Sequence, residues 1–455
     1  MTALIVAFLA ILLLTFWATR TWCLVRVFNL IFATSSILAI IAFCRETAAI
    51  GKGMWYSVAF MLCLLLPAIF SKFFSIRKPS LPLADHGIYC NRLVFNKRIL
   101  WGILLLSVGL GFVHPIVRLQ EAGFSFSSLF YTKLTTISES VYNQSLLGQN
   151  PGAGWHSAPF LSFLYLAPLV GGLLAVSSRY KWAAVILAIL PTIFALVVTS
   201  SKSFVILSGF LVCSSAASAY FLAGGRVHVT LALCAKTLLL AVGALLFFLL
   251  GFQLRYSGSS TRGSLNWQSR TILIYSLGGY MGFDAWYSAQ SNLNNFNLSG
   301  MATFTAIPHL LGYPRNSGVY SDYTPLEAGA LRHVHTRTYW RCTYDDAIYL
   351  GSRLRETNIY TSLRGLVLDF GICGTLLLAL CAGALDKVLF SPKRLAPLGR
   401  RLSITSIWLA TCGNLFALYS WIISPFIYSS VLAALLLYLV VLFVARRRNI
   451  SVADH

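Results

Sequence analysis

The feature that most constrains this chain is a series of long apolar runs that recurs along almost its whole length. As a helix, each run is long enough to cross the roughly 30 Å hydrocarbon core of a bilayer. With 57% hydrophobic and only 11% charged residues, the 455-residue chain cannot be a soluble globular protein. We therefore predict an all-α polytopic membrane protein with about eleven transmembrane helices. The expected spans are 2–19, 27–44, 54–74, 98–117, 158–177, 182–199, 204–223, 229–252, 362–385, 403–421 and 425–445.

The distribution of lysine and arginine predicts the side of the membrane on which each loop lies. If the arginine run 446–448 is inside, alternation along the chain places most basic residues of the short loops inside as well. The N-terminus and the two longest loops, 118–157 and 253–361, are then outside. Short basic loops facing anionic lipid also explain the net charge of +22 without nucleic acid. We expect residues 1–455 to form a single integral membrane domain.

The two outer loops differ in character. Loop 118–157 is rich in glycine and other turn residues. Loop 253–361 contains an apolar and aromatic stretch, Ile272 to Trp286, which Gly278, Gly279 and Gly282 interrupt. We expect these glycines to break a regular span, so the stretch would be a re-entrant or interfacial helix that lines a cavity.

Loop 253–361 is also unusual in its charge, because it holds nine arginines and no lysine. Arginine is normally kept inside, so this cluster outside suggests that the loop holds an anion. Guanidinium groups bind phosphate through two hydrogen bonds, and the loop's eleven tyrosines offer aromatic faces to sugars. The alternative is that the arginines pair with the loop's own carboxylates, such as Asp284 and Glu327. The nine are Arg255, Arg262, Arg270, Arg315, Arg332, Arg337, Arg341, Arg353 and Arg355.

Charged residues also lie in or beside the expected spans. Arg364 and Asp369 fall in the outer half of span 362–385, where a charge costs about 2.5–3.5 kcal/mol to insert. Both should face the bundle interior or water, either near substrate or as structural groups. Lys202 lies in a Thr-Ser-Ser-Lys-Ser run (199–203) at an outer helix end, where the hydroxyls and the cation can either cap backbone groups or touch a diphosphate.

Motifs for other chemistries are missing from the sequence. There is no Gly-rich nucleotide-binding loop with Lys-Ser/Thr, no Gly-x-Ser-x-Gly elbow, no His-Glu-x-x-His and no Asp-x-Asp. The ten cysteines have neither a disulfide framework nor metal-ligand spacing. We therefore expect no cofactor and no metal.

Several short motifs resemble those of a known family. They are the run Asn358, Tyr360, Thr361, then Leu-Asp-Phe-Gly-x-x-Gly at 368–374, the run 199–203, Arg255 at the end of a span, and the stretch from Tyr275 to Asp284. Together with the layout of spans and one large outer loop, they are similar to bacterial oligosaccharide repeat-unit polymerases of the Wzy type. Lys202 differs from the arginine that many relatives have there.

This resemblance implies an inner-membrane protein with its active site facing the periplasm and with the architecture of GT-C glycosyltransferases. Its activity would be to polymerise oligosaccharide units carried on undecaprenyl diphosphate into O-antigen or a related surface polysaccharide, without a metal. The same lipid-linked oligosaccharide would be donor and acceptor, and a polysaccharide chain-length regulator would be a possible partner. The alternatives are an O-antigen ligase and a flippase or exporter of lipid-linked glycan.

Roles follow for individual residues. We expect Arg255 and Arg270 to grip the departing diphosphate, and we expect Asp345, Asp346 or Asp369 to be the general base. His333, His335 and Glu327 are rival bases, and Asp345 and Asp346 have the alternative of ordering the loop through salt bridges. The residues expected to bind substrate are Lys202, Arg262, Tyr275, Arg337, Arg341, Asn358, Tyr360 and Arg364.

Overall fold

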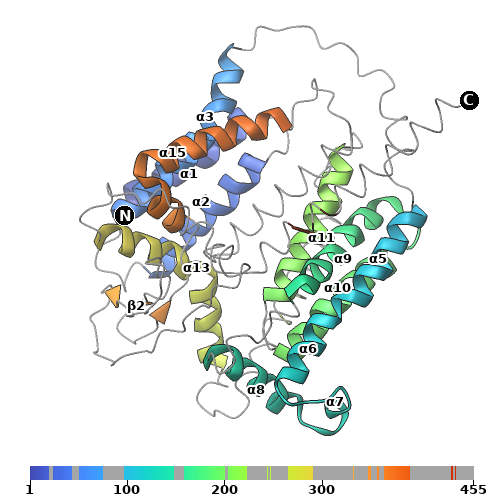
Figure 1. Cartoon of the computed structure of the whole chain (residues 1–455). Helices are drawn as coiled ribbons and strands as arrows, with labels where there is room; N and C mark the ends of the chain where they lie inside the picture. Colours follow the sequence, from blue (N-terminus) through green and yellow to red (C-terminus); the bar gives the residue numbers. More distant parts are fainter. Residues whose placement is uncertain are drawn as a thin grey trace, which may run out of the picture. The chain divides into compact units, whose positions relative to one another are not determined.

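Over the residues that it describes, the computed structural model is almost entirely helical (Figure 1). Within the described residues, five helical segments are long and apolar enough to cross a membrane. The protein is therefore an all-α membrane protein, as its apolar runs predict. The described residues are 1–19, 24–43, 51–74, 97–147, 158–199, 203–222, 243, 246, 265–289, 331–332, 347–349, 356–357, 363–389, 432–433 and 436.

Each expected span that lies in these ranges coincides with a helix. The spans 229–252, 403–421 and 425–445 fall outside them, apart from single positions. The helices are α1 (Thr2–Ala18), α2 (Leu24–Phe43), α3 (Lys52–Phe74), α5 (Lys97–Gly111) with α6 (Val113–Glu121), α9 (Ala158–Ser177), α10 (Lys181–Thr199), α11 (Ser203–Leu222) and α15 (Leu363–Leu389).

The chain divides into two compact units, which we describe one at a time. Unit 1 comprises residues 1–80, 269–394 and 414–425, and unit 2 comprises the remainder. That the two form a single integral domain stays a prediction.

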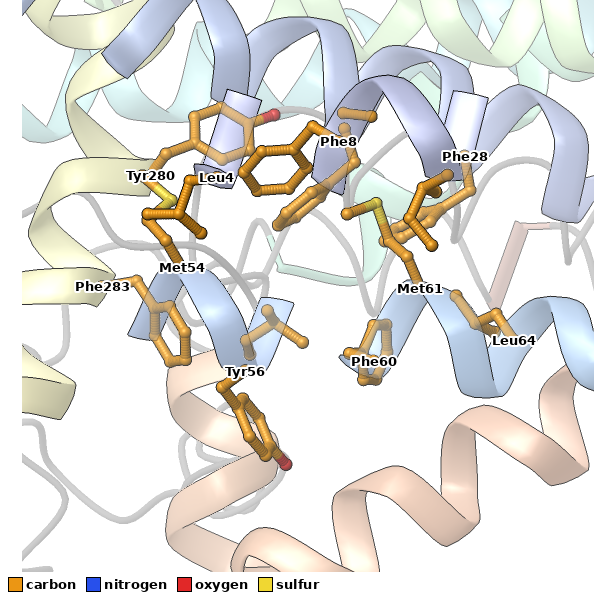
Figure 2. Packing of buried hydrophobic residues seen from close by; sticks show 14 of the residues in the cluster. Leu4, Phe8, Phe28, Met54, Tyr56, Phe60, Met61, Leu64, Tyr280 and Phe283 are labelled. Atoms are coloured by element: carbon orange, nitrogen blue, oxygen red, sulfur yellow. The ribbon is translucent and has the colours of Figure 1, made fainter. Parts of the chain in front are cut away.

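Unit 1 is built on α3, which packs against α1, α2 and α15. Phe8 of α1, Phe28 of α2 and Met61 of α3 meet in its core (Figure 2). Tyr280, from α13 (Leu265–Ala289), completes this core, since its ring lies edge-on to Phe32 with 4.8 Å between centroids. Aromatic rings thus connect α13 to the membrane helices.

Two basic side chains lie together at one end of unit 1. At this end, Arg26 lies 4.7 Å from the ring centroid of Phe16, and Lys72 lies 3.9 Å from that of Trp17. Asp386, near the C-terminus of α15, accepts a hydrogen bond from the N–H of Val25 at this same end. The N-termini of α3 and α15 therefore lie at the other end, about 33 Å away along the 23-residue α3.

Helix α13 corrects one expectation. The stretch from Ile272 to Trp286 is helical throughout, and Gly278, Gly279 and Gly282 do not interrupt it. All three glycines are buried. Glycine costs about 1 kcal/mol in a helix interior, which packing against neighbouring elements readily offsets.

A small antiparallel sheet follows α13 in the sequence. Its strands are β1 (Leu331–Arg332), β2 (Ala347–Tyr349) and β3 (Glu356–Thr357), in the order β1-β2-β3. Leu331 pairs with Ile348, which pairs with Thr357. The loop expected at 253–361 thus contains a 25-residue helix and a sheet. The sequence predicted a helix over part of that length and did not predict the sheet.

Unit 2 packs α9 against α5, α10 and α11. Gly172 of α9 lies so close to α11 that an added Cβ would stand 2.4 Å from the carbonyl oxygen of Val212. Close approach through glycine is typical of helix pairs in membranes. Beyond α6 come α7 (Ser128–Tyr131) and α8 (Leu134–Leu147), so the loop expected at 118–157 is largely helical over its described part.

The seam between α3 and α15 in unit 1 is equally tight. A Cβ built on Gly383 of α15 would stand 2.1 Å from the carbonyl oxygen of Leu64 on α3. The two backbones are therefore in direct contact at this level, and α3 and α15 run beside each other in Figure 1.

Candidate functional site

The most informative charged group among the described residues is Arg364. It is the second residue of α15, and only 1% of its surface is exposed. A buried arginine is costly in a membrane protein and is retained mainly where it serves a function or a specific contact. Arg364 therefore marks the candidate site at the N-terminal end of α15.

Trp286 of α13 provides the surface beneath Arg364. The guanidinium carbon lies 5.1 Å from the centroid of the Trp286 ring, which is within the range of a cation–π interaction. Trp286 is itself 2% exposed. Because Trp286 belongs to segment 253–361 and Arg364 to the span that follows, this contact connects the arginine-rich segment with the membrane helices.

Asp284, two residues before Trp286, ties the same part of α13 to α3. Its carboxylate oxygens accept hydrogen bonds from the backbone N–H of Gly51 at 3.0 Å and of Met54 at 2.9 Å. Burial raises the pKa of Asp284 above its ordinary value of 3.8, while hydrogen bonds from the backbone of Gly51, Gly53 and Met54 act in the opposite direction. The carboxylate thus caps the N-terminus of α3 from another helix.

Two tyrosines connect this cap to the middle of α15. The rings of Tyr56 on α3 and Tyr287 on α13 are stacked, with 5.0 Å between centroids. The hydroxyl of Tyr56 donates a hydrogen bond to the carbonyl oxygen of Ile372 at 2.9 Å, and Figure 2 shows this hydroxyl directed toward α15.

Ile372 follows a break in α15. Gly371 has φ 66° and ψ −176°, a conformation that essentially only glycine adopts. The hydroxyl of Thr375 donates to the Gly371 carbonyl at 2.8 Å. Backbone irregularity within a membrane helix needs such covering partners. The hydroxyls of Thr375 and Tyr56 are these partners, and they bind the consecutive carbonyls of Gly371 and Ile372.

The structure places few of the expected site residues. Arg270 and Tyr275 lie on α13, and Arg364 and Asp369 on α15. Arg270 is about 24 Å along the helix axis from Trp286, so it does not share the level of Arg364. Asp369 lies two residues before the break at Gly371. The other expected residues lie outside the described ranges: Lys202, Arg255, Arg262, Arg337, Arg341, Asp345, Asp346, Asn358 and Tyr360.

Sequence reasoning missed the connections among these helices. Its alternative interpretation paired Asp284 with arginines of the segment, whereas the carboxylate caps α3 through backbone N–H groups. The position of Asp284 within an aromatic stretch of the sequence was a signal that its carboxylate has a specific partner. Tyr56 had no comparable signal, because its neighbours are ordinary for a membrane span.

Comparison of the chain with protein-family models, with curated proteins and with solved structures finds no match. Function must therefore be argued from the residues themselves. Within the described part, the site offers a buried guanidinium, an aromatic platform and a helix end fixed by a carboxylate. A guanidinium fixed in this way can neutralise an anion at the edge of a membrane. Because its position is already set, it can hold that anion without solvent reorganisation.

Proposed function

We propose that the chain polymerises undecaprenyl-diphosphate-linked oligosaccharide repeat units into O-antigen or a related surface polysaccharide. The observation that carries the proposal is the contact between Arg364 and Trp286. It brings a buried cation of one membrane helix onto the arginine-rich and tyrosine-rich segment that precedes it. The proposal also rests on the resemblance of the motifs at 199–203 and 358–374 to polymerases of the Wzy type.

In this proposal the enzyme has about eleven spans, a GT-C-like architecture and a place in the bacterial inner membrane. The placement of Arg26 and Lys72 together at the expected inner end of unit 1 supports the proposed orientation. Arg364 then lies at the periplasmic end. A polysaccharide chain-length regulator is the proposed protein partner.

The proposed reaction is glycosyl transfer without a metal. A hydroxyl of the acceptor unit attacks the anomeric carbon of the donor, and the bond to undecaprenyl diphosphate breaks. A base accepts the hydroxyl proton, and arginines receive the negative charge of the departing diphosphate. Arg364 would contribute a charge whose position is fixed by the Trp286 ring.

Purified enzyme given its lipid-linked repeat unit tests the proposal. A polymerase should yield a ladder of longer lipid-linked glycans together with free undecaprenyl diphosphate. A ligase should react only after a lipid A core acceptor is added, and a flippase should leave the substrate unchanged. Either of these two results would overturn the proposal.

A matched pair of charge variants sharpens this test. Arg364→Gln should reduce product formation, whereas Lys387→Gln, near the other end of α15, should not, because Lys387 is exposed. Size-exclusion profiles and thermal unfolding would show that both variants remain folded.

A further inference from the structure

One turn of unit 2 carries exposed aromatic side chains. The turn covers residues 123–132, between α6 and α8, and contains no charged residue. Its sequence alternates serine with phenylalanine and ends in Phe130 and Tyr131. The side chains of these two residues are 75% and 88% exposed, respectively.

The backbone of the turn is ordered by the way in which α6 ends. Gly123 has φ 82°, its N–H donates to the carbonyl of Gln120 at 2.9 Å, and the N–H of Phe124 donates to that of Leu119 at 3.1 Å. These two bonds define a Schellman motif. Phe124 also packs against the cluster that contains Leu119, the apolar contact that commonly accompanies this motif.

Serine hydroxyls hold the rest of the turn. The hydroxyl of Ser125 lies 2.7 Å from that of Ser127 and 3.1 Å from that of Ser128. The Ser128 hydroxyl accepts the N–H of Ser125, and the Ser128 carbonyl accepts the N–H of Thr132 at 2.8 Å. The turn thus satisfies much of its backbone internally, which lowers the cost of leaving bulk water.

The depth of the turn follows from its neighbours. The candidate span Lys97–Glu121 leads directly into it. The ring of Phe126 contacts that of Phe194, with 6.2 Å between centroids, one turn before α10 ends at Thr199. Leu119 and Val198 share one buried cluster, so the two candidate spans end at the same level. The turn therefore lies where hydrocarbon gives way to headgroups.

We propose that residues 123–132 are a membrane-interface anchor, in which Phe126, Phe130 and Tyr131 insert into the boundary between headgroups and acyl chains. Aromatic rings are enriched at that depth. The candidate span that leads into the turn also exposes apolar side chains, among them Leu105 and Leu106. The partner is thus phospholipid, and the anchor would fix the depth and tilt of α6 and α10.

Photo-crosslinking tests this assignment. The photoreactive residue p-benzoyl-phenylalanine would replace Phe130, and separately Tyr131, in the full chain within phosphatidylethanolamine–phosphatidylglycerol nanodiscs. After irradiation, intact-protein mass spectrometry should detect adducts one phospholipid heavier. Their yield should be comparable to that at Leu106, which is 60% exposed on α5.

A buried position gives the matched control. The same substitution at Leu119, which is 0% exposed, should crosslink within the protein and give no phospholipid adduct. Yields at 130 and 131 as low as at 119 would overturn the anchor, and so would adducts with a second copy of the chain. Substitution at these exposed side chains leaves the buried packing of unit 2 unchanged, and the two positions report independently. Neither result depends on whether the enzyme polymerises glycans.

Discussion

The backbone of Gly53 on α3 lies directly against Asp284 on α13, because a Cβ added to Gly53 would stand 2.6 Å from the Asp284 Cα. No side chain can therefore be added at Gly53 without moving one of the two helices. The same close approach lets the Asp284 carboxylate reach the N–H of Met54. Glycine at one position and aspartate at the other thus form one joint between a span and the arginine-rich segment.

We expect Gly53→Ala to lower the thermal midpoint of unfolding in detergent, because the clash is with backbone. Asp284→Ala should lower it too, since loss of a cap costs about 1–2 kcal/mol. Gly102→Ala on α5 is the matched control, because nothing lies within 4 Å of its added Cβ. Equal midpoints for Gly53→Ala and Gly102→Ala would contradict the joint.

Gly371→Ala should destabilise α15 or straighten it. Alanine at the φ and ψ of Gly371, which essentially only glycine adopts, costs on the order of 1–3 kcal/mol, so the helix would lose either stability or its break. Tyr56→Phe, which removes the hydroxyl bonded to Ile372, should cost about 1 kcal/mol. Thermal unfolding of both variants, with Gly109→Ala as an unhindered control, measures this. A Gly371→Ala midpoint at or above wild type, with activity retained, would show that the break is dispensable.

The sequence predicted the helices of this protein better than their connections. Apolar runs locate α3, α9 and α10 closely, because any span must satisfy its backbone within the helix. The break at Gly371 could not be predicted, because Tyr56, which covers the Ile372 carbonyl, comes from another helix, and a threonine four residues after a glycine, as Thr375 is here, is no signal of a break by itself.

The candidate site was predicted only in part. Arg364 was expected to be functional because a charge in a span is costly, and the structure places it on Trp286. The capping of α3 by Asp284 depends on the meeting of two helices at Gly53. These helices are far apart in the sequence, because Asp284 and Met54, which it binds, are separated by 230 residues. The roles expected for Arg255, Asp345 and Asp346 stay predictions.

Arg255→Lys and Arg270→Lys should each reduce polymer formation sharply. Lysine keeps the charge but loses the paired hydrogen bonds to a phosphate. Loss of one contact that strengthens in the transition state costs about 2.7–4 kcal/mol, or roughly 100- to 1000-fold in rate. Initial rates with purified lipid-linked substrate measure the effect, after immunoblotting has matched the amounts of enzyme. Full-length polymer at the wild-type rate would remove these arginines from the mechanism.

A general base should be revealed by Asp345→Asn, Asp346→Asn or Asp369→Asn. The variant that removes the base should still bind the lipid-linked unit, while turnover falls about 100- to 10,000-fold. Binding and turnover must be measured separately, because a loop-ordering role for Asp345 and Asp346 would weaken both. Near-normal turnover in all three would leave a histidine or the diphosphate itself to accept the proton.

Cysteine labelling should place segment 253–361 and the C-terminal tail on opposite sides of the membrane. A membrane-impermeant maleimide should label Ser299→Cys in intact spheroplasts and Ser451→Cys only after permeabilisation. The control is the unmodified chain, which reports labelling of its native cysteines. Labelling of both new cysteines from the same side would contradict the orientation.

The seam at Gly383 also limits where the isoprenoid tail of a lipid-linked substrate can run. With the Gly383 position held against the Leu64 carbonyl, there is no room for even a methyl group between α3 and α15 at that level. A prenyl chain therefore cannot thread between these two helices there. If the proposed lipid-linked substrate binds near Arg364, its tail cannot cross from one side of the α3–α15 pair to the other at the level of Gly383.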